Sequence, residues 1–524
     1  MVSVTTRNLD LEKKEANYRD NIMSSNKKYW KSEAELSAND AMIETLKQNE
    51  FVEQIPTGEF LSDKQTLATS NTNRRDFLKY VGFSTAAASL AACEGPVIKS
   101  IPYVVQPEQI IPGVANFYAT TIANGYDFAS ILVKTREGRP IKVENNKDAQ
   151  VKGTANARVQ ASVLSLYDSA RLQGPSFNGA PADWSDLDNA VTTALDAAKT
   201  SGKKVVFLTP TYASPSMSKL VAEFVQGQDQ VSHVVYDAIS ESAALDAFEA
   251  VTGERALADY HLEKATVIVS FGADFLGDWQ GGGFDGGYAK GRIPSARQMS
   301  QHYQFESNMT LSGAAADKRV PSNSAQQAQA LAALYEIVTT GATSVALPEN
   351  IMAAVKSAAK AVVKAGNKAV VLTGIDSVEA QSLVLRLNAS IESVAFDVAA
   401  PRYVRQGSDK AVQSLIADMA AGQVGLLVVD GVNPVYSLPN AAEFKSALSN
   451  VGTTVAFSTM PNETTASVQW VGAASHYLES WGDVAVKKGY YSLTQPTIKE
   501  LFDTRQFQTA LMKWAGIEGT YYDY

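Results

Sequence analysis

The chain of 524 residues contains a single cysteine, Cys93, and only four histidines. One cysteine excludes an internal disulfide, a thiolate zinc site, a CxxCH haem site and a cysteine-bound iron–sulfur cluster. The histidines are His233, His261, His302 and His476. They show neither HExxH nor His-x-His spacing. We therefore predict no metal site in this chain, and spacing alone identifies no catalytic residue.

Basic charge and long apolar runs are also scarce. Lys and Arg number 46 against 55 Asp and Glu, which gives a formal net charge of −9. Nucleic-acid binding depends on a basic surface, so this composition gives it no support. After Cys93 no apolar run reaches the roughly 20 residues that a membrane-spanning helix needs. The length allows more than one domain with a substantial core.

The chain does contain an export signal followed by a lipid-attachment motif. The residues that carry the twin-arginine pattern are Arg74, Arg75, Phe77, Leu78 and Lys79. The uncharged run Tyr80–Ala92 is too short to span a bilayer but suits a signal-peptide core, and it ends in the lipobox pattern Leu-Ala-Ala-Cys. We predict a lipid on Cys93 at the periplasmic face of a bacterial inner membrane, with 1–92 as leader and signal. The alternative is a basic helix start followed by a buried, Ala-rich helix.

Proline punctuates the segment after the lipobox. Pro96, Pro102, Pro107 and Pro112 block a helix. Residues 93–118 are therefore predicted to form an extended, apolar strap that lies against another surface. Two β-rich runs with a turn at Glu137–Pro140 then predict a small antiparallel β domain over 119–157, followed by a helical pattern over 158–170.

From about residue 200, short apolar runs alternate with helical stretches, as in buried parallel sheets. The predicted strands are Val205–Thr209, Val267–Phe271, Val370–Thr373, Leu426–Asp430 and Val455–Ser458. The predicted helices are Ser216–Val225, Ala325–Val338, Ile351–Lys364, Val378–Asn388 and Lys410–Ala420. This pattern predicts an α/β fold with doubly wound parallel sheets, in which 158–200 and 346–524 form one domain and 201–345 an inserted one. Any ligand cleft would lie at the carboxyl ends of the strands.

Three clusters could carry chemistry, and each has a simpler structural explanation. Gly281–Gly287 lacks the GxGxxG and Walker patterns, which favours a flexible loop over a phosphate cradle. His476 and Glu479 stand close in sequence beside a serine, but no GxSxG elbow accompanies them. Asp274 and Asp278 could form a carboxylate pair, although acidic residues after a strand are common helix caps.

Longer stretches resemble the large-subunit family of molybdopterin oxidoreductases. They are VKTREGRPIKVENN with QASVLSLYDSARLQGP, then HYQFESNMTLSGAAADKRVP, and finally VVDGVNPVYSLP with ETTASVQWVGAASHYLESWGD. The KKYWKS leader, the lipobox and the IPYVVQPEQIIPGVANFYATT strap narrow this resemblance to the B subunits of bacterial alternative complex III, a quinol-oxidising respiratory complex. The match runs through most of 23–524 and implies a molybdoenzyme-like multi-domain fold.

The departures from the family pattern matter as much as the match. Family members commonly have a cysteine where Gly153–Ala157 stands in this chain. The resemblance is therefore to the N-terminal, cofactor-free half of the B subunit, and it implies iron–sulfur clusters in a further C-terminal half or a partner. It also implies a multihaem cytochrome and a quinol-binding membrane subunit as partners. By the same resemblance, Asn433, Pro434, His476 and Glu479 are vestiges of cofactor-binding loops.

These observations lead to one functional expectation with two alternatives. The expectation is a non-catalytic, molybdoenzyme-like scaffold within a quinol-oxidising complex, without activity of its own. The first alternative is a working molybdopterin oxidoreductase that lacks only its cluster. The second is a periplasmic solute-binding lipoprotein, since α/β lobes behind a lipobox also fit that class.

Overall fold

The structure is a computed structural model that describes residues 110–111, 113–149, 155–226, 228, 230–294 and 299–524. The predicted leader and signal over 1–92, with Cys93 and the arginine pair, lie outside the described residues, as does most of the 93–118 strap. None of the helices within the described part of the chain has the length and apolar character needed to cross a bilayer.

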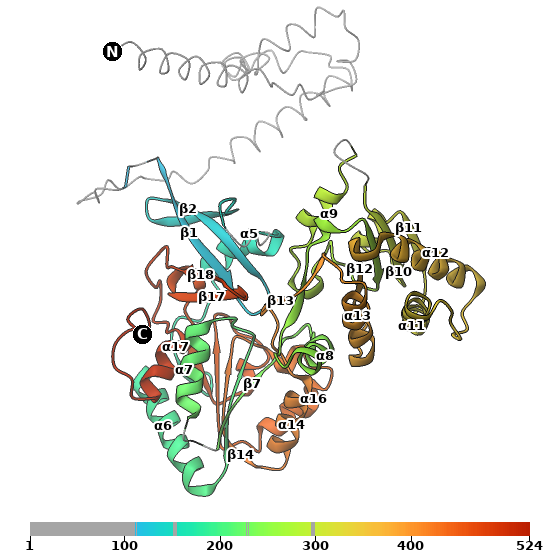
Figure 1. The fold of residues 1–524 in the computed structure, drawn as a ribbon. Coiled ribbons are helices and arrows are strands. Elements are labelled where there is room, and N and C mark those ends of the chain that lie inside the picture. The colour runs from blue at the N-terminus through green and yellow to red at the C-terminus, as the bar shows by residue number, and fades with distance from the viewer. Residues whose placement is uncertain (1–109, 112, 150–154, 227, 229, 295–298) are drawn as a thin grey trace, which may run out of the picture. The chain divides into compact units, whose positions relative to one another are not determined.

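A three-stranded antiparallel sheet comes first, in blue in Figure 1. Its strands β1 (Ala115–Ala123), β2 (Phe128–Arg136) and β3 (Arg139–Asn145) pair in chain order. Glu137 and Gly138 form the predicted β2–β3 turn with φ of 51° and 76°, as a two-residue hairpin requires. Helix α5 (Ala157–Leu166) packs on this sheet, and the shared core includes Ile131 and Val133 of β2 and Val163 of α5. The predicted antiparallel β segment is present, and its first strand takes up the last residues of the predicted strap.

The largest sheet has seven strands in the order β5-β4-β16-β15-β14-β6-β7. The strands are β4 (Ser176–Phe177), β5 (Ala180–Pro181), β6 (Lys204–Thr209), β7 (Val231–Val235), β14 (Val424–Asp430), β15 (Thr453–Ser458) and β16 (Trp470–Ala473). The five from β7 to β16 are parallel. In chain order they run 2-1-3-4-5, the flavodoxin-like winding, so the topological switch point lies between β6 and β14.

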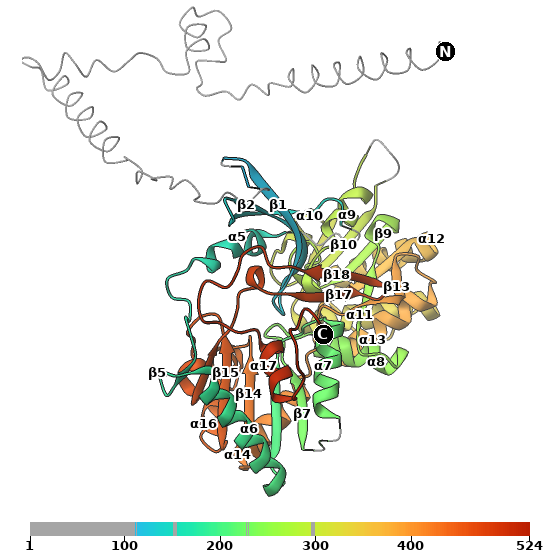
Figure 2. The ribbon, with the colours of Figure 1, turned by 90° about the vertical axis from the view of Figure 1, so that its left-hand side faces the viewer.

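Helices cover both faces of the seven-stranded sheet, which makes it doubly wound (Figure 2). One face packs against α6 (Trp184–Ser201), α7 (Pro215–Val225) and α17 (Phe507–Trp514). The other packs against α14 (Asp409–Ala420) and α16 (Ala441–Leu448), and the short α15 (Pro434–Ser437) follows β14. The strands are apolar on both sides because both sides are buried.

The second parallel sheet has four strands in the order β11-β10-β9-β12. They are β9 (Val267–Phe271), β10 (Gln301–Glu306), β11 (Lys318–Pro321) and β12 (Ala369–Thr373). The helices α11 (Ser324–Thr340), α12 (Glu349–Ala365) and α13 (Val378–Ser390) cover one face, and α8 (Ser242–Thr252) and α9 (Asp285–Gly291) pack on the other. The chain order 3-2-1-4 is that of a Rossmann half, with its switch point between β9 and β12.

A third sheet, in the order β18-β17-β13-β8, contains antiparallel pairs. Its strands are β8 (Leu257–Tyr260), β13 (Phe396–Arg402), β17 (Gly482–Lys487) and β18 (Tyr490–Thr494). The sheets do not follow the predicted domain limits. Strand β6 pairs with β14 and with β7, while β12 pairs with β9. The chain therefore leaves the seven-stranded sheet near residue 241 and returns to it near residue 403, instead of at the predicted limits 201 and 345. The predicted α/β domain began at residue 158, within helix α5. In the structure this helix packs on the small antiparallel sheet instead.

Candidate functional site

The switch point of the seven-stranded sheet is the first place to seek a ligand, because α/β sheets bind ligands where the strand order reverses. Here the two sides are joined across the crevice. The Tyr212 hydroxyl after β6 donates to Asp430 Oδ2 at the end of β14, at 2.5 Å. Burial raises the pKa of Asp430 to about 6 despite this hydrogen bond, and burial and the same carboxylate raise the pKa of Tyr212 well above its usual value. The Tyr212 hydroxyl therefore keeps its proton and donates a hydrogen bond to the carboxylate at neutral pH.

The loop between β1 and β2 lies over this switch point. A Cβ atom on Gly125, whose φ is +81°, would overlap Pro210, the residue directly after β6. Arg405 lies 5.1 Å from the Tyr126 ring centroid and donates to the Tyr126 carbonyl at 3.2 Å. The small β domain thus covers the edge at which a doubly wound sheet would receive a ligand.

The N-terminus of α7 is the second candidate, since a helix following the first strand commonly receives a phosphate or other anion. Asp483 of β17 occupies it. Its carboxylate accepts from Ser214 Oγ at 2.5 Å and from the Ser216 backbone N and Oγ at 3.1 and 2.8 Å. Ser214 is also the N-cap and accepts from Met217 N. The anion at this helix N-terminus is therefore a side chain of the chain itself.

Asn433 and Pro434, predicted as vestigial loop residues, follow β14 at the same edge. Asn433 Oδ1 accepts from the Thr464 backbone N at 3.1 Å and its hydroxyl at 2.7 Å, and Asn433 Nδ2 donates to Glu463 at 2.7 Å. This hydrogen bond is the main reason that the pKa of Glu463 is lowered. Pro434 is buried at the first position of α15, where its fixed φ suits a helix start. Asn433 therefore ties the β14 loop to the segment after β15.

His476 and Glu479 follow β16 and do not form a base–carboxylate pair. His476 Nδ1 accepts from Leu478 N at 3.3 Å, so Nε2 carries the proton towards Ser165 Oγ at 3.0 Å. Burial, with a contribution from Arg171, lowers the pKa of His476 to about 4. Glu479 accepts from the His476 backbone N, completing a capping box around the helical turn η7 (Tyr477–Glu479). The neutral imidazole thus caps a turn.

Arg171 is the partner of Glu479 that the sequence analysis missed. Its Nη1 and Nη2 donate to the two carboxylate oxygens at 3.0 and 2.8 Å, and the two side chains are 1% and 0% exposed. Burial is the largest influence and opposes ionisation of Glu479. The hydrogen bonds and charge of Arg171, with the backbone N–H groups of His476 and Leu501, together outweigh burial and leave the pKa below its ordinary value. This buried pair joins the segment after α5 to the segment after β16. Nothing near Arg171 in sequence signals it, because its partner is 308 residues away.

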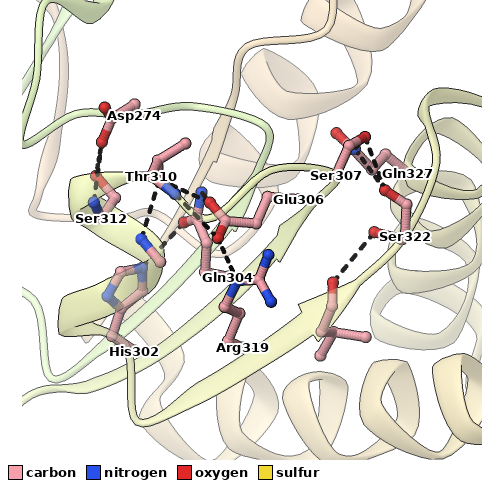
Figure 3. Close-up of polar contacts among 12 residues, drawn as sticks. Asp274, His302, Gln304, Glu306, Ser307, Thr310, Ser312, Arg319, Ser322 and Gln327 are labelled. Atoms are coloured by element: carbon pink, nitrogen blue, oxygen red, sulfur yellow. Dashed lines mark hydrogen bonds and ion pairs between the residues drawn. The ribbon is translucent and has the colours of Figure 1, made fainter.

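At the four-stranded sheet, Glu306 occupies the end of β10, the position of the acidic residue that holds a ribose in dinucleotide-binding sheets. Figure 3 shows its carboxylate turned back onto the chain. Oε1 accepts from Arg319 Nε at 2.5 Å and Thr310 N at 3.3 Å, and Oε2 accepts from Thr310 Oγ1 at 2.6 Å and Gln304 Nε2 at 3.4 Å. These donors fill the sites at which the buried carboxylate could accept a ligand hydroxyl.

Glycines bring the backbone of this edge into contact. A Cβ on Gly313 would overlap the Glu306 carboxylate, and one on Gly374 would lie 2.5 Å from the Gly272 carbonyl oxygen. Gly272 and Gly374 follow β9 and β12, the two strands of the switch point, so the crevice between them is closed by the backbone itself.

The remaining predicted clusters have structural roles as well. Asp274 accepts from the backbone and hydroxyl of Ser312, at the start of α10 (Leu311–Ala315), as Figure 3 shows. Asp278 pairs with Arg158 of α5, which also holds Asp127. The two aspartates therefore do not act as a carboxylate pair. The glycine cluster was predicted to be a loop. Gly281 ends the 3-10 helix η4 (Trp279–Gly281), the next three residues form a loop, and the last three begin α9.

Comparison with known proteins agrees with this architecture. With solved structures, the chain is similar to acetylene hydratase from Pelobacter acetylenicus, with a TM-score of 0.60, 10% identity, and coverage of 76% of this chain and 70% of the other. The fold is thus a molybdoenzyme-like, multi-domain α/β fold with parallel sheets and an N-terminal antiparallel sheet, as predicted.

Among curated proteins, the chain is similar to the menaquinone reductase, molybdopterin-binding-like subunit of Nitratidesulfovibrio vulgaris Hildenborough. The two are 26% identical over 503 residues, which cover 85% of this chain and 72% of the relative. No protein-family model matches the chain.

The described residues do not fit a molybdopterin cofactor as they are arranged. The anion position on α7 holds Asp483, the Glu306 carboxylate is saturated, and Tyr212 and Asp430 bridge the larger switch point. No group of three or more His, Cys, Asp or Glu side chains within the described ranges is placed to hold a metal ion. The described part of the chain therefore has the architecture of a cofactor-binding fold with side chains of its own at the binding edges.

Proposed function

We propose that this chain is a non-catalytic, molybdoenzyme-like scaffold subunit of a membrane respiratory complex that reacts with quinol. The curated relative reported above is described as a molybdopterin-binding-like subunit and is named for a menaquinone reductase. The observation that carries the proposal is the Asp483 carboxylate on the N-terminus of α7, because it takes the position of a ligand anion. The twin-arginine pattern and lipobox support assembly at the periplasmic face of the inner membrane.

Electron carriage in this proposal belongs to neighbouring subunits. The partners are an iron–sulfur half or subunit, a multihaem cytochrome and a membrane subunit that binds quinol, as in alternative complex III. The chain itself supplies a rigid α/β body whose own side chains bridge its sheet edges.

The test is metal and pterin analysis of the complex purified from native membranes through a tag on this chain. We expect haem and iron–sulfur subunits to co-purify, and molybdenum, tungsten and pterin to stay far below one per chain. Stoichiometric molybdenum or tungsten with pterin would instead establish a working molybdopterin enzyme. Saturable binding of a small solute by the isolated chain would favour the solute-binding alternative.

A separate measurement tests the anchor. The intact mass of the mature chain is expected to begin at a lipid-modified Cys93, since lipobox processing replaces the signal with acyl chains and more than one chain gives stable anchoring. An unmodified Cys93 thiol in the membrane-bound protein would contradict the proposed attachment. Replacing Arg74 and Arg75 by lysine is expected to retain the protein in the cytoplasm.

A further inference from the structure

The outer face of the small antiparallel sheet carries four cations in a compact array. Side chains of β2 alternate between the core shared with α5 and this outer face. The strand register places Lys134 opposite Lys142 of β3 and Arg136 opposite Arg139. Like charges directly opposite each other on adjacent strands are destabilising. The sheet therefore carries an arrangement that costs stability by itself and that an anionic partner would relieve.

The chain itself neutralises little of this charge. Lys142 pairs with Glu144 at 2.9 Å, and its hydrogen bond is the main cause that lowers the pKa of Glu144. Among the ion pairs within the described residues, this is the one that involves the array. Glu137 at the turn is the other acidic residue of the β2–β3 hairpin. The face thus keeps a positive balance on a chain whose formal net charge is −9.

Exposed apolar side chains border the array at the start of β1. Phe117 lies opposite Lys134 in the sheet, and the Lys134 Nζ is 5.8 Å from the Phe117 ring centroid. Arg136 Nη2 donates to the Gly113 carbonyl at 2.9 Å, just before β1. Three large apolar side chains here are 59%, 53% and 53% exposed: Ile111, Val114 and Phe117. The four cations and these three apolar residues together form one surface, the basic face.

We propose that the basic face docks on the anionic phospholipid surface of the membrane that carries the chain. A lipid surface matches both parts of the face, because it offers phosphate charge beside an apolar interior, and both contribute to surface binding. The inference rests on the lipid anchor of the proposed function. Residues 94–109 join Cys93 to this end of the sheet and span at most roughly 60 Å when extended. The anchor therefore holds the face near the bilayer at a high effective concentration.

The first test places a probe on the basic face. Cys93→Ser removes the one cysteine of the full chain, and Ala119→Cys adds one at an exposed position of β1 near Phe117. An environment-sensitive fluorophore there is expected to respond to vesicles of phosphatidylcholine with phosphatidylglycerol. The response should be lost in about 1 M salt, where the Debye length falls to about 3 Å. The same fluorophore at Val363→Cys, an exposed position of α12, is the control.

This chain carries no lipid, so the result does not depend on whether Cys93 is modified in the cell. Equal responses from the probes at Ala119 and Val363 would overturn the proposal. An equal response to vesicles of phosphatidylcholine alone would overturn it as well, because the cations would then have no part in binding.

The second test removes one cation from each like-charged pair. Lys134→Gln with Arg139→Gln is expected to weaken vesicle binding about 25-fold, measured with the probe at Ala119, since each cation near an anionic surface contributes about fivefold. Tm should stay unchanged or rise, because repulsion across the strands is relieved. The matched control is Lys356→Gln with Lys360→Gln, which removes the same charge from exposed positions of α12.

Equal losses of binding in the two double variants would contradict the proposal, and a lower Tm of the first would contradict the repulsion on which it rests. The first double variant could instead retain vesicle binding and lose partner subunits from the native complex. That outcome would assign the basic face to an acidic protein and overturn the assignment to lipid.

Discussion

At the carboxyl ends of both parallel sheets, buried carboxylates are bound by other side chains of the chain. The two sheets differ in how far along the sequence those partners lie. At the seven-stranded sheet, Asp430 is bound by Tyr212, which is 218 residues away, and Glu479 by Arg171, which is 308 residues away. At the four-stranded sheet, Glu306 is bound by Thr310 and Arg319, 4 and 13 residues away. The first closure depends on docking between separate parts of the chain, whereas the second is built within one sheet and its connections. Among the described residues, the carboxylates at the two sheet edges are therefore engaged in two independent ways.

The largest loss of stability is expected from breaking the buried pair of Arg171 and Glu479. Arg171→Met leaves the Glu479 carboxylate buried without its cation, and breaking a buried pair costs about 3–5 kcal/mol. The measurement is urea-induced unfolding followed by tryptophan fluorescence. Lys204→Met is the control, because it breaks a surface pair with Asp418 and such pairs contribute about 0–1 kcal/mol. Equal losses in the two variants would show that the Arg171 pair does not secure this edge.

The close packing of Gly313 on the Glu306 carboxylate can be tested by adding a methyl group there. Gly313→Ala places a methyl group on the Glu306 carboxylate, and overpacking of this kind costs about 1–3 kcal/mol. Gly286→Ala in α9 is the matched control, since no atom lies within 4 Å of its added Cβ. In a Glu306→Ala background, Gly313→Ala should cost little. A cost that persists there would mean that the carboxylate is not what excludes the methyl group.

Asp483→Ala tests whether a side chain holds the anion position of α7. Losing the contacts with Ser214 and Ser216 is expected to cost about 1–2 kcal/mol, as for the loss of a helix cap. Inorganic phosphate should then raise the Tm of the variant more than that of the wild type, because the vacated N-terminus binds anions. An identical response of the two proteins to phosphate would count against this assignment.

Asp430→Asn is expected to change the pH dependence of stability by a smaller amount. The pKa of Asp430 is about 6 in the folded chain against about 3.9 for an unfolded aspartate. The folded state therefore binds the proton more tightly, and Asp430 destabilises the fold increasingly as pH rises from about 4 to 6, by about 1–2 kcal/mol. The asparagine variant should lack this component. Unfolding midpoints at pH 4.5 and 7 measure it; an unchanged difference between the two pH values would contradict it.

The smallest effect on stability is expected from a substitution at the start of β1, in the small antiparallel sheet. Phe117 is 53% exposed, and Ile111 and Val114 nearby are also exposed. Phe117→Ser should change the stability of the isolated chain by less than about 0.5 kcal/mol, as at other surface positions. If the strap is an interface, the same variant should lose partner subunits during purification. Full recovery of the complex would leave the strap without a role in assembly.

The sequence predicted the elements well and their neighbours less well. Strands such as Val267–Phe271 were located because continuous apolar runs mark strands buried on both faces. Such runs carry no information about which sheet they join, so the predicted strands that became β6 and β12 were each assigned to the wrong domain. The candidate site shows the same limit. His476 and Asn433 stand out in sequence, but Arg171, Tyr212 and Asp483 act through partners hundreds of residues away.

The contact between β1 and the end of β18 has a consequence for the timing of folding. Thr494 Oγ1 donates to the Thr121 carbonyl at 2.8 Å, and Gln495 N donates to Thr120 Oγ1 at 2.9 Å, across 373 and 375 residues. At a synthesis rate of about 5–20 residues per second, the ribosome takes roughly 20–75 s to supply these partners. Until then β1 lacks part of its native surroundings, and the nascent chain offers chaperones a binding target. An export route that accepts only folded cargo would therefore have to wait until the last strand has left the ribosome.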